Sequence, residues 1–305
     1  MAHRLRLYVT AVLMLFVLAP LCAQEPVTDT VSVTLQPADT LAALNPAPEE
    51  GTIGHRFAYD MGSIYRGVLF TYSRPAHWQK DDFITAGAFL GSSAFLTLAD
   101  ESMADYFSKQ GKKVPEGWHK AGWYMGKPQY NYTFTLGFYA AGLITKNQKI
   151  RRAGVVMITA ATTGGLLQTV FKQVAGRARP SAGVSHMSFK PFSKEEAYHS
   201  FPSGHTILST TVFYSLSKQF SNPWVKAGFY TAGLLTPASR MWDNAHWISD
   251  VFVGAGIGII CVESAERFLK LNERYAADRA AGVKEKKISW NIRAGYNQIG
   301  ITGTF

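Results

Sequence analysis

The sequence has little charge and almost no cysteine. Charged residues make up 17% of its 305 residues, below the level of about a quarter that is usual for soluble domains, whereas apolar residues make up 47%. The two cysteines are Cys22 and Cys261, and Cys22 lies in a predicted export signal, so one thiol would remain after cleavage. The count excludes an internal disulfide framework and a cysteine metal site.

Acidic charge is scarce relative to basic charge. The 31 Lys and Arg residues and 21 Asp and Glu residues give a formal net charge of +10, which favours an anionic partner. The basic residues form no dense cluster interleaved with aromatic residues, so we expect no nucleic-acid partner. Many flank uncharged segments instead, which points to phosphate groups or anionic lipid headgroups. Ordinary solubilising charge is the alternative interpretation.

The first 23 residues have the pattern of a secretory signal peptide. A basic start precedes an apolar run at 7–19, and cleavage can follow Ala23. Residues 24–51 are rich in Thr, Pro, Ala and acidic residues without apolar periodicity, which predicts a flexible linker. We therefore expect export to the cell envelope and a helical domain over 52–270.

Six segments of the predicted domain contain no charged residue. A helix with one face in water carries a charge every turn or so, so these segments predict helices that are buried or embedded in a membrane. Several are shorter than the roughly 20 residues that a span needs. The sequence predicts an all-α bundle with about six core helices, embedded in a membrane in the interpretation that we prefer and soluble in the alternative. The segments are 83–99, 128–145, 153–171, 206–217, 227–239 and 251–262.

The basic residues between these segments indicate an orientation. If all six cross a bilayer, the Lys and Arg residues at 146–152, at 218–226 and from 270 onward fall on one side, as the positive-inside rule predicts. The chemistry described below would then lie on the periplasmic side. Three crossings before it would, however, start the domain on the inner side, whereas a cleaved signal starts it outside. Either one segment does not cross, or the bundle does not span the membrane.

The end of the chain has a different pattern. From residue 288 apolar residues alternate with polar ones, which is the period of a β-strand. We expect residues 271–305 to form a basic tail that ends in a short strand or hairpin.

Two short segments combine cations with a helix start. Lys172 and Arg179 are seven residues apart, a spacing that places both on one face of a helix. Ser203 and Gly204 belong to a Pro-Ser-Gly turn before an uncharged helix, where free backbone N–H groups and the helix dipole favour an anion. The adjacent His205 can give or take a proton at neutral pH. Taken alone, each segment also fits an ordinary helix end.

A third segment runs from Ser239 to Asp250. His246 and Asp250 are four residues apart and share one helical face. A carboxylate that holds one imidazole nitrogen leaves the other free as a nucleophile. Arg240 adds a guanidinium whose fork matches phosphate oxygens. Together the three segments meet the needs of phosphoryl transfer, which are positioning and charge neutralisation, without a metal.

In order and spacing these segments resemble the signature of the type 2 phosphatidic acid phosphatase and vanadium haloperoxidase superfamily, over residues 153–258. The pattern is Lys, six residues, Arg-Pro; Pro-Ser-Gly-His; and Ser-Arg, five residues, His, three residues, Asp. The resemblance implies an all-α core in which His246 forms a phosphohistidine, Asp250 orients it and His205 protonates the leaving oxygen, with no metal or cofactor. The residues that it implies for phosphate binding are Lys172, Arg179, Ser203, Gly204 and Arg240.

The function that we prefer is hydrolysis of a phosphomonoester or pyrophosphate on a lipid, at the outer face of the cytoplasmic membrane. A soluble periplasmic nonspecific acid phosphatase is the alternative. A vanadate-dependent haloperoxidase is less favoured, because the chain is short and only 35 residues separate His205 from Arg240. A phosphate-binding protein without activity would be expected to lack the nucleophile or its carboxylate. The sequence leaves the particular substrate and the oligomeric state open.

Overall fold

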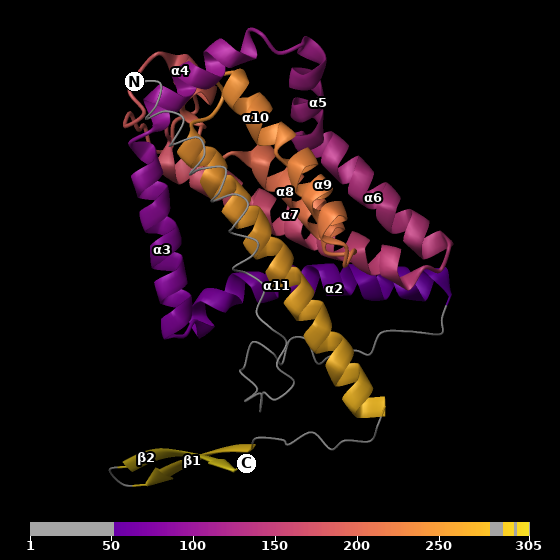
Figure 1. The fold of residues 1–305 in the computed structure, drawn as a ribbon. Coiled ribbons are helices and arrows are strands. Elements are labelled where there is room, and N and C mark those ends of the chain that lie inside the picture. The colour runs from indigo at the N-terminus through magenta and orange to yellow at the C-terminus, as the bar shows by residue number, and fades with distance from the viewer. Residues whose placement is uncertain (1–51, 281–288, 296–297, 305) are drawn as a thin grey trace. The chain divides into compact units, whose positions relative to one another are not determined.

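The computed structural model describes residues 52–280, 289–295 and 298–304, with side chains to residue 273. The predicted signal peptide and linker, at 1–51, and much of the predicted basic tail lie outside the described residues. Figure 1 shows the described chain as a succession of helices. In chain order these are α2 (Ile53–Ser73), α3 (Lys80–Thr97), α4 (Asp100–Gly111), α5 (Glu116–Gly126), α6 (Pro128–Ile144), α7 (Gln148–Ala175), α8 (Gly204–Ser217), α9 (Pro223–Gly233), α10 (Leu235–Trp242) and α11 (Ile248–Ala280). The shorter 3-10 turns are η2 (Arg74–His77), η3 (Pro180–Ala182) and η4 (Glu196–Tyr198).

The uncharged segments all fall in helices, which confirms the all-α prediction. They lie in α3, α6, α7, α8, the α9–α10 pair and α11. The fifth segment is divided because α9 ends at Gly233 and α10 begins anew at Leu235, with Pro237 in its first turn. A proline is tolerated there because the first turn has no intrahelical acceptor for its missing N–H. The charged helices α2, α4 and α5 complete the body, and a search for uncharged segments does not detect them.

Two helices are long and apolar enough to cross a membrane. These are α7 and the part of α11 from 248 to 273, and the bent pair α3–α4, with an angle of 66°, makes a third if it forms one span. The other helices among the described residues do not pass this test. At most three of the six uncharged segments therefore have the length and composition of a span, so more than one of them fails this test.

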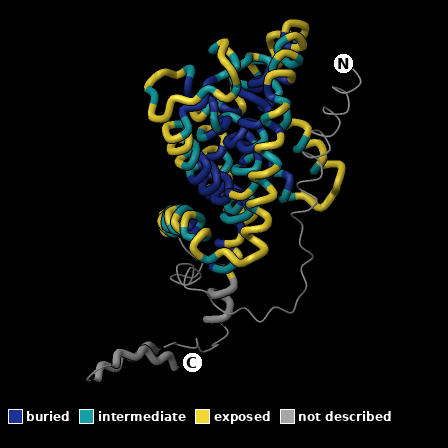
Figure 2. The backbone as a smooth tube through the Cα atoms, turned by 90° about the vertical axis from the view of Figure 1, so that its left-hand side faces the viewer, coloured by how far each residue is buried: buried dark blue, intermediate teal, exposed yellow. Residues whose placement is uncertain are grey.

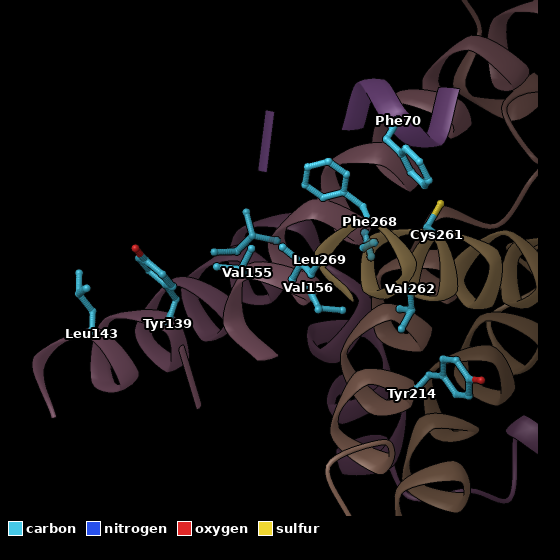
Figure 3. Close-up of a cluster of buried hydrophobic side chains, with 13 residues drawn as sticks. Phe70, Tyr139, Leu143, Val155, Val156, Tyr214, Cys261, Val262, Phe268 and Leu269 are labelled. Atoms are coloured by element: carbon cyan, nitrogen blue, oxygen red, sulfur yellow. The ribbon is translucent and has the colours of Figure 1, made fainter. Parts of the chain in front are cut away.

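Helix α7 lies at the centre of the packing. It contacts α2, α6, α8 and α11, and residues 153–161 are buried without a break. Figure 2 shows the buried residues gathered inside the helical body. In the core cluster of Figure 3, Phe70 of α2 and Phe268 of α11 pack with ring centroids 5.6 Å apart, against Val156 of α7 and Val262 of α11. Burial of these apolar side chains fixes α7 and α11 against each other, and both helices carry site residues at one end.

Three glycines make close contacts around the predicted site segments. Gly176 ends α7 with a left-handed φ of 55°, and an added Cβ would lie 1.9 Å from the carbonyl oxygen of Lys190, so only glycine fits. On α5, a Cβ at Gly126 would lie 2.6 Å from Cβ of His205, and one at Gly122 would lie 2.5 Å from Cβ of Ser239. The α5 backbone therefore packs directly against two of the segments that carry the predicted chemistry.

Strands β1 (Ser289–Gly295) and β2 (Gln298–Thr304) lie in the segment whose alternation predicts a strand or hairpin. They pair antiparallel, with Ser289 opposite Thr304 and Gly295 opposite Gln298.

Candidate active site

The three predicted segments meet at the C-terminal end of α7 and the N-terminal ends of α8 and α11. The backbone N–H of Ser203 donates to the carbonyl of Asp250 at 3.1 Å, which joins the start of α8 to α11. The indole N–H of Trp247 donates to the carbonyl of Ala178 at 2.7 Å, which joins α11 to the loop after α7. All eight residues predicted for the site therefore belong to one contiguous region.

His246 is held by a backbone carbonyl. Its Nδ1 lies 2.7 Å from the carbonyl oxygen of Ser200, and the side chain is almost fully buried. A carbonyl only accepts, so Nδ1 carries the proton and Nε2 keeps its lone pair. Burial, together with the charges of Lys172 and Arg179, lowers the pKa of His246 well below its usual value. The imidazole is therefore neutral at neutral pH, as a nucleophile must be.

Asp250 reaches His246 indirectly. Its Oδ2 lies 3.9 Å from Nδ1 of His246, beyond hydrogen-bond distance. That oxygen instead accepts from the hydroxyl of Ser200 at 2.5 Å and from the backbone N–H of Trp247 at 3.0 Å. Asp250 holds Ser200, and the Ser200 carbonyl orients the histidine. The expected direct pair between Asp250 and His246 is thus replaced by a relay, because the Ser200 backbone lies between them.

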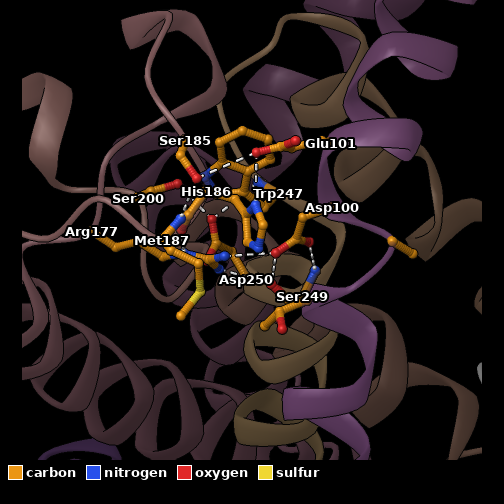
Figure 4. A network of polar contacts seen from close by, with 12 residues as sticks. Asp100, Glu101, Arg177, Ser185, His186, Met187, Ser200, Trp247, Ser249 and Asp250 are labelled. Atoms are coloured by element: carbon orange, nitrogen blue, oxygen red, sulfur yellow. Dashed lines mark hydrogen bonds and ion pairs between the residues drawn. The ribbon is translucent and has the colours of Figure 1, made fainter.

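A buried ion network extends from Asp250, as Figure 4 shows. Arg177 donates from Nη1 to Asp250 and from Nη2 to Asp100, the first residue of α4, both at 2.6 Å. Asp100 also accepts from the backbone N–H and the hydroxyl of Ser249, at 3.0 and 2.8 Å. All four side chains are buried. The guanidinium thus lies between two carboxylates, and the network keeps a formal charge of −1 near His246.

The start of α8 has the geometry of an anion site. Gly204 begins the helix, so backbone N–H groups are free at this point. A Cβ at Gly204 would lie 1.5 Å from Oε1 of Gln168, which projects from α7 one turn before Lys172. Ser203 is buried, and its hydroxyl lies 2.9 Å from that of Thr206. A side chain at this position would require Gln168 to move, because the glutamine occupies the space of a Cβ.

Two buried side-chain nitrogen atoms in this region have no hydrogen-bond partner among the described residues. They are Nε2 of His205 and Nε of Arg179. Burial and the charges of Arg240, Lys172, Arg179 and Lys127 lower the pKa of His205 to about 3. The region is therefore strongly electropositive, with donor atoms available to an oxyanion.

Arg240 is buried and shares a carboxylate with a histidine. Its Nη2 pairs with Oδ2 of Asp243, and Oδ1 of Asp243 lies 2.6 Å from Nδ1 of His119 on α5. The other ring nitrogen of His119 lies 3.1 Å from the carbonyl oxygen of Gly111. The sequence pattern assigns no role to Asp243 or His119, and the contact between these two joins residues 124 positions apart. Both fix the guanidinium that we expect to bind phosphate.

A pocket of about 560 Å³ opens beside Arg240. Its walls combine aromatic rings with charged groups, and most of them belong to α5. The lining includes Glu116, His119, Lys120, Trp123, Tyr124 and Asp243.

The comparisons with known proteins agree with this geometry. Residues 153–270 match the model of the PAP2 superfamily. The chain is 28% identical over 196 residues to a lipid A 1-phosphatase of Rhizobium etli, which covers 60% of this chain and 82% of that protein. A lipid A 1-phosphatase of Rhizobium johnstonii is 27% identical over 197 residues, 60% of this chain and 78% of that protein. One from Porphyromonas gingivalis is 38% identical over 69 residues, 22% of this chain and 16% of that protein.

A crystal structure of Aquifex aeolicus LpxE is also similar, with a TM-score of 0.43 and 21% identity, covering 55% of this chain and 94% of that one. The family match and the lipid A 1-phosphatase relatives indicate a phosphatase that acts on a lipid phosphate. Residues 153–270 therefore form a PAP2 superfamily domain, and it contains the three sequence segments that predict this resemblance.

Proposed function

We propose that the chain removes a phosphate group from a phosphorylated lipid through a phosphohistidine on His246. The observation that carries this proposal is the neutral imidazole of His246, held by the Ser200 carbonyl so that Nε2 is free beside Lys172 and Arg179. The lipid A 1-phosphatase relatives and the apolar helices support a lipid substrate, and a phosphorylated lipid A is the first candidate.

In the first half-reaction Nε2 of His246 attacks phosphorus. The phosphorus–oxygen ester bond breaks, its electron pair goes to the leaving oxygen, and His205 supplies the proton. Lys172, Arg179 and Arg240 neutralise the non-bridging oxygens, while backbone N–H groups at Ser203 and Gly204 donate to them. These cations lower the pKa of His205 in the free protein, so a bound phosphate dianion offsets their effect and raises that pKa towards the working range.

In the second half-reaction a water molecule attacks the phosphohistidine. His205, now neutral, accepts a proton from this water. The phosphorus–nitrogen bond breaks, its electron pair returns to Nε2 of His246, and inorganic phosphate leaves. Through Ser200 and Asp250 the network keeps negative charge near His246 while the ring carries the phosphoryl group.

We also propose that the site lies on the periplasmic side of the membrane. Lys172 is at the C-terminal end of α7 and Asp250 at the N-terminal end of α11, so both site segments lie at the same end of the two candidate spans. The basic residues Lys149, Arg151 and Arg152 are at the opposite end of α7, which the positive-inside rule places in the cytoplasm.

Phosphate release by protein purified in detergent tests the proposal. The substrates are lipid A, phosphatidate and a water-soluble phosphomonoester. We expect release from at least one lipid, loss of release in His246→Ala, and full release in His199→Ala, whose Nε2 instead bonds to the Ser193 carbonyl at 2.8 Å. Activity retained in His246→Ala would refute the mechanism. Release from the soluble ester alone would refute the lipid substrate and favour a nonspecific acid phosphatase.

A further inference from the structure

The end of α5 and the start of α6, which we call the wall, lie between two hollows. The hollows differ in whether charged or apolar residues line them. On one side is the polar pocket beside Arg240. On the other is a groove of about 460 Å³ between α6 and α8, whose lining is almost entirely apolar. Tyr124 lines both, so the two hollows are neighbours across one side chain.

The groove is built from both helices along the same stretch. Tyr130 and Phe134 come from α6, and Val212 and Leu216 from α8. A polar exception is Asn131, whose side chain is 3% exposed and donates to the carbonyl of Leu208 at 2.8 Å. Its Oδ1 has no hydrogen-bond partner among the described residues. The groove thus offers a long apolar surface with a single buried acceptor.

The groove begins at a lipid-sized distance from the reacting centre. On α8, Val212 follows His205 by seven residues and Leu216 follows it by eleven. At a rise of about 1.5 Å per residue these side chains lie about 10 and 16 Å along the helix from His205. A phosphate at the site and a chain in the groove would therefore be separated by roughly the size of a lipid headgroup.

The wall itself has the chemistry of a membrane interface. The Nζ atom of Lys127 lies 4.1 Å from the ring centroid of Trp123 and 5.8 Å from that of Tyr130. The Trp123 ring in turn stacks on His205, with centroids 6.3 Å apart. Aromatic rings and a lysine with its amino group in water are typical of the boundary between headgroups and acyl chains. The wall marks this boundary beside the catalytic histidine.

We infer that the groove between α6 and α8 binds one acyl chain of the substrate while its phosphate lies at His246. This inference rests on the proposed function. A chain moving from a bilayer or micelle into the groove gains little hydrophobic free energy, because both environments are apolar. The groove therefore selects by shape, since a chain that fits allows the phosphate to reach the nucleophile.

The test uses a substitution that fills the groove and two substrates that differ in the length of their acyl chains. Leu216→Trp places a larger ring in the groove, and Leu136→Trp places the same ring on α6 at a half-exposed position outside it. The substrates are phosphatidates with 16-carbon or 6-carbon chains, both in the same detergent. We expect Leu216→Trp to lower kcat/KM about tenfold for the long chains only, and Leu136→Trp to change neither value. Equal values for the two variants with both substrates would overturn the inference.

A second measurement requires no substitution. Wild-type protein is labelled with a phosphatidate that carries a photoreactive diazirine on its acyl chain, and the modified peptides are identified by mass spectrometry. Excess unlabelled phosphatidate should suppress labelling at Phe134 and Leu216 but not at Leu136, which is half-exposed outside the groove. Equal suppression at all three would refute the groove. If wild-type protein cleaves neither phosphatidate nor lipid A, both the proposed function and the acyl-chain groove are refuted. Cleavage without selective suppression of labelling refutes the groove alone.

Discussion

The Nδ1 atom of His246 donates to the backbone carbonyl of Ser200 at 2.7 Å. The group that orients the proposed nucleophile is therefore part of the main chain, and no side-chain substitution can remove it. Asp250 acts one step further away, through the Ser200 hydroxyl and the backbone N–H of Trp247. Because of this arrangement, we expect substitutions of Ser200 and of Asp250 to have different effects on activity.

Ser200→Ala should weaken the reaction less than Asp250→Asn. The alanine keeps the carbonyl that holds His246 and loses one charge-assisted hydrogen bond, so we expect kcat to fall about tenfold to a hundredfold. The asparagine loses the charge that balances Arg177 and should lower kcat more than a hundredfold. Steady-state kinetics of both variants check the order. A larger loss in Ser200→Ala would show that the hydroxyl, and not the carbonyl, is the essential group.

Arg177→Met should destabilise the protein strongly. It leaves Asp100 and Asp250 buried and without their shared cation, and breaking a buried ion pair in this way costs about 3–5 kcal/mol. Arg152→Met is the matched control, because the Arg152–Glu273 pair is partly exposed and should contribute about 1 kcal/mol or less. Thermal unfolding in detergent measures both. Similar losses of Tm would mean that the network is far better solvated than its burial indicates.

Gly204→Ala should impair phosphate binding by displacing Gln168. The new Cβ would occupy the position of Oε1 of Gln168, so the glutamine or the start of α8 must shift, and KM should rise about tenfold or more. Gln168→Ala removes the obstacle, so the double variant should recover part of the loss. A double-mutant cycle of kcat/KM tests this coupling. Strictly additive effects would mean that the alanine lowers kcat/KM through the backbone and not through Gln168.

Stability should fall as pH falls from about 6.5 towards 3. The folded pKa of His205 is about 3, below the usual histidine value of 6.5, so in this window the unfolded chain binds a proton that the folded chain does not. The stabilisation is complete above the unfolded pKa and is lost on acidification. His205→Asn should flatten the slope of Tm against pH. Part of the slope should remain in this variant, because the pKa of His246 is also lowered. An unchanged slope in His205→Asn would contradict the lowered pKa.

The sequence predicts the members of the site better than the contacts between them. Lys172, Arg179, His205 and Arg240 lie in short segments whose spacing reflects local helix geometry. The network around Asp250 is harder to predict, because Asp100, which pairs with the same Arg177, is 150 residues away and resembles an ordinary acidic residue at a helix start. The Ser200 carbonyl has no side-chain pattern at all.

Local sequence patterns likewise predict some of the helices and not others. Uncharged segments predict α7 and α11 because burial removes charge from every face. They do not predict α5, whose glycines face the site while its charged residues line the pocket. The fold of α5 depends on contacts with α8 and α10 that no local pattern records.

Helix α5 consequently has two faces with different packing constraints. Gly122 and Gly126 press its backbone against Ser239 and His205, where any larger residue would collide with the reacting centre. Glu116 and Lys120 on the same helix line the pocket without such a restriction. A lineage could therefore exchange one headgroup for another by substitutions on a single helix while the chemical step stays intact. The same property makes α5 the segment on which to begin if the enzyme is to be redesigned for a new lipid.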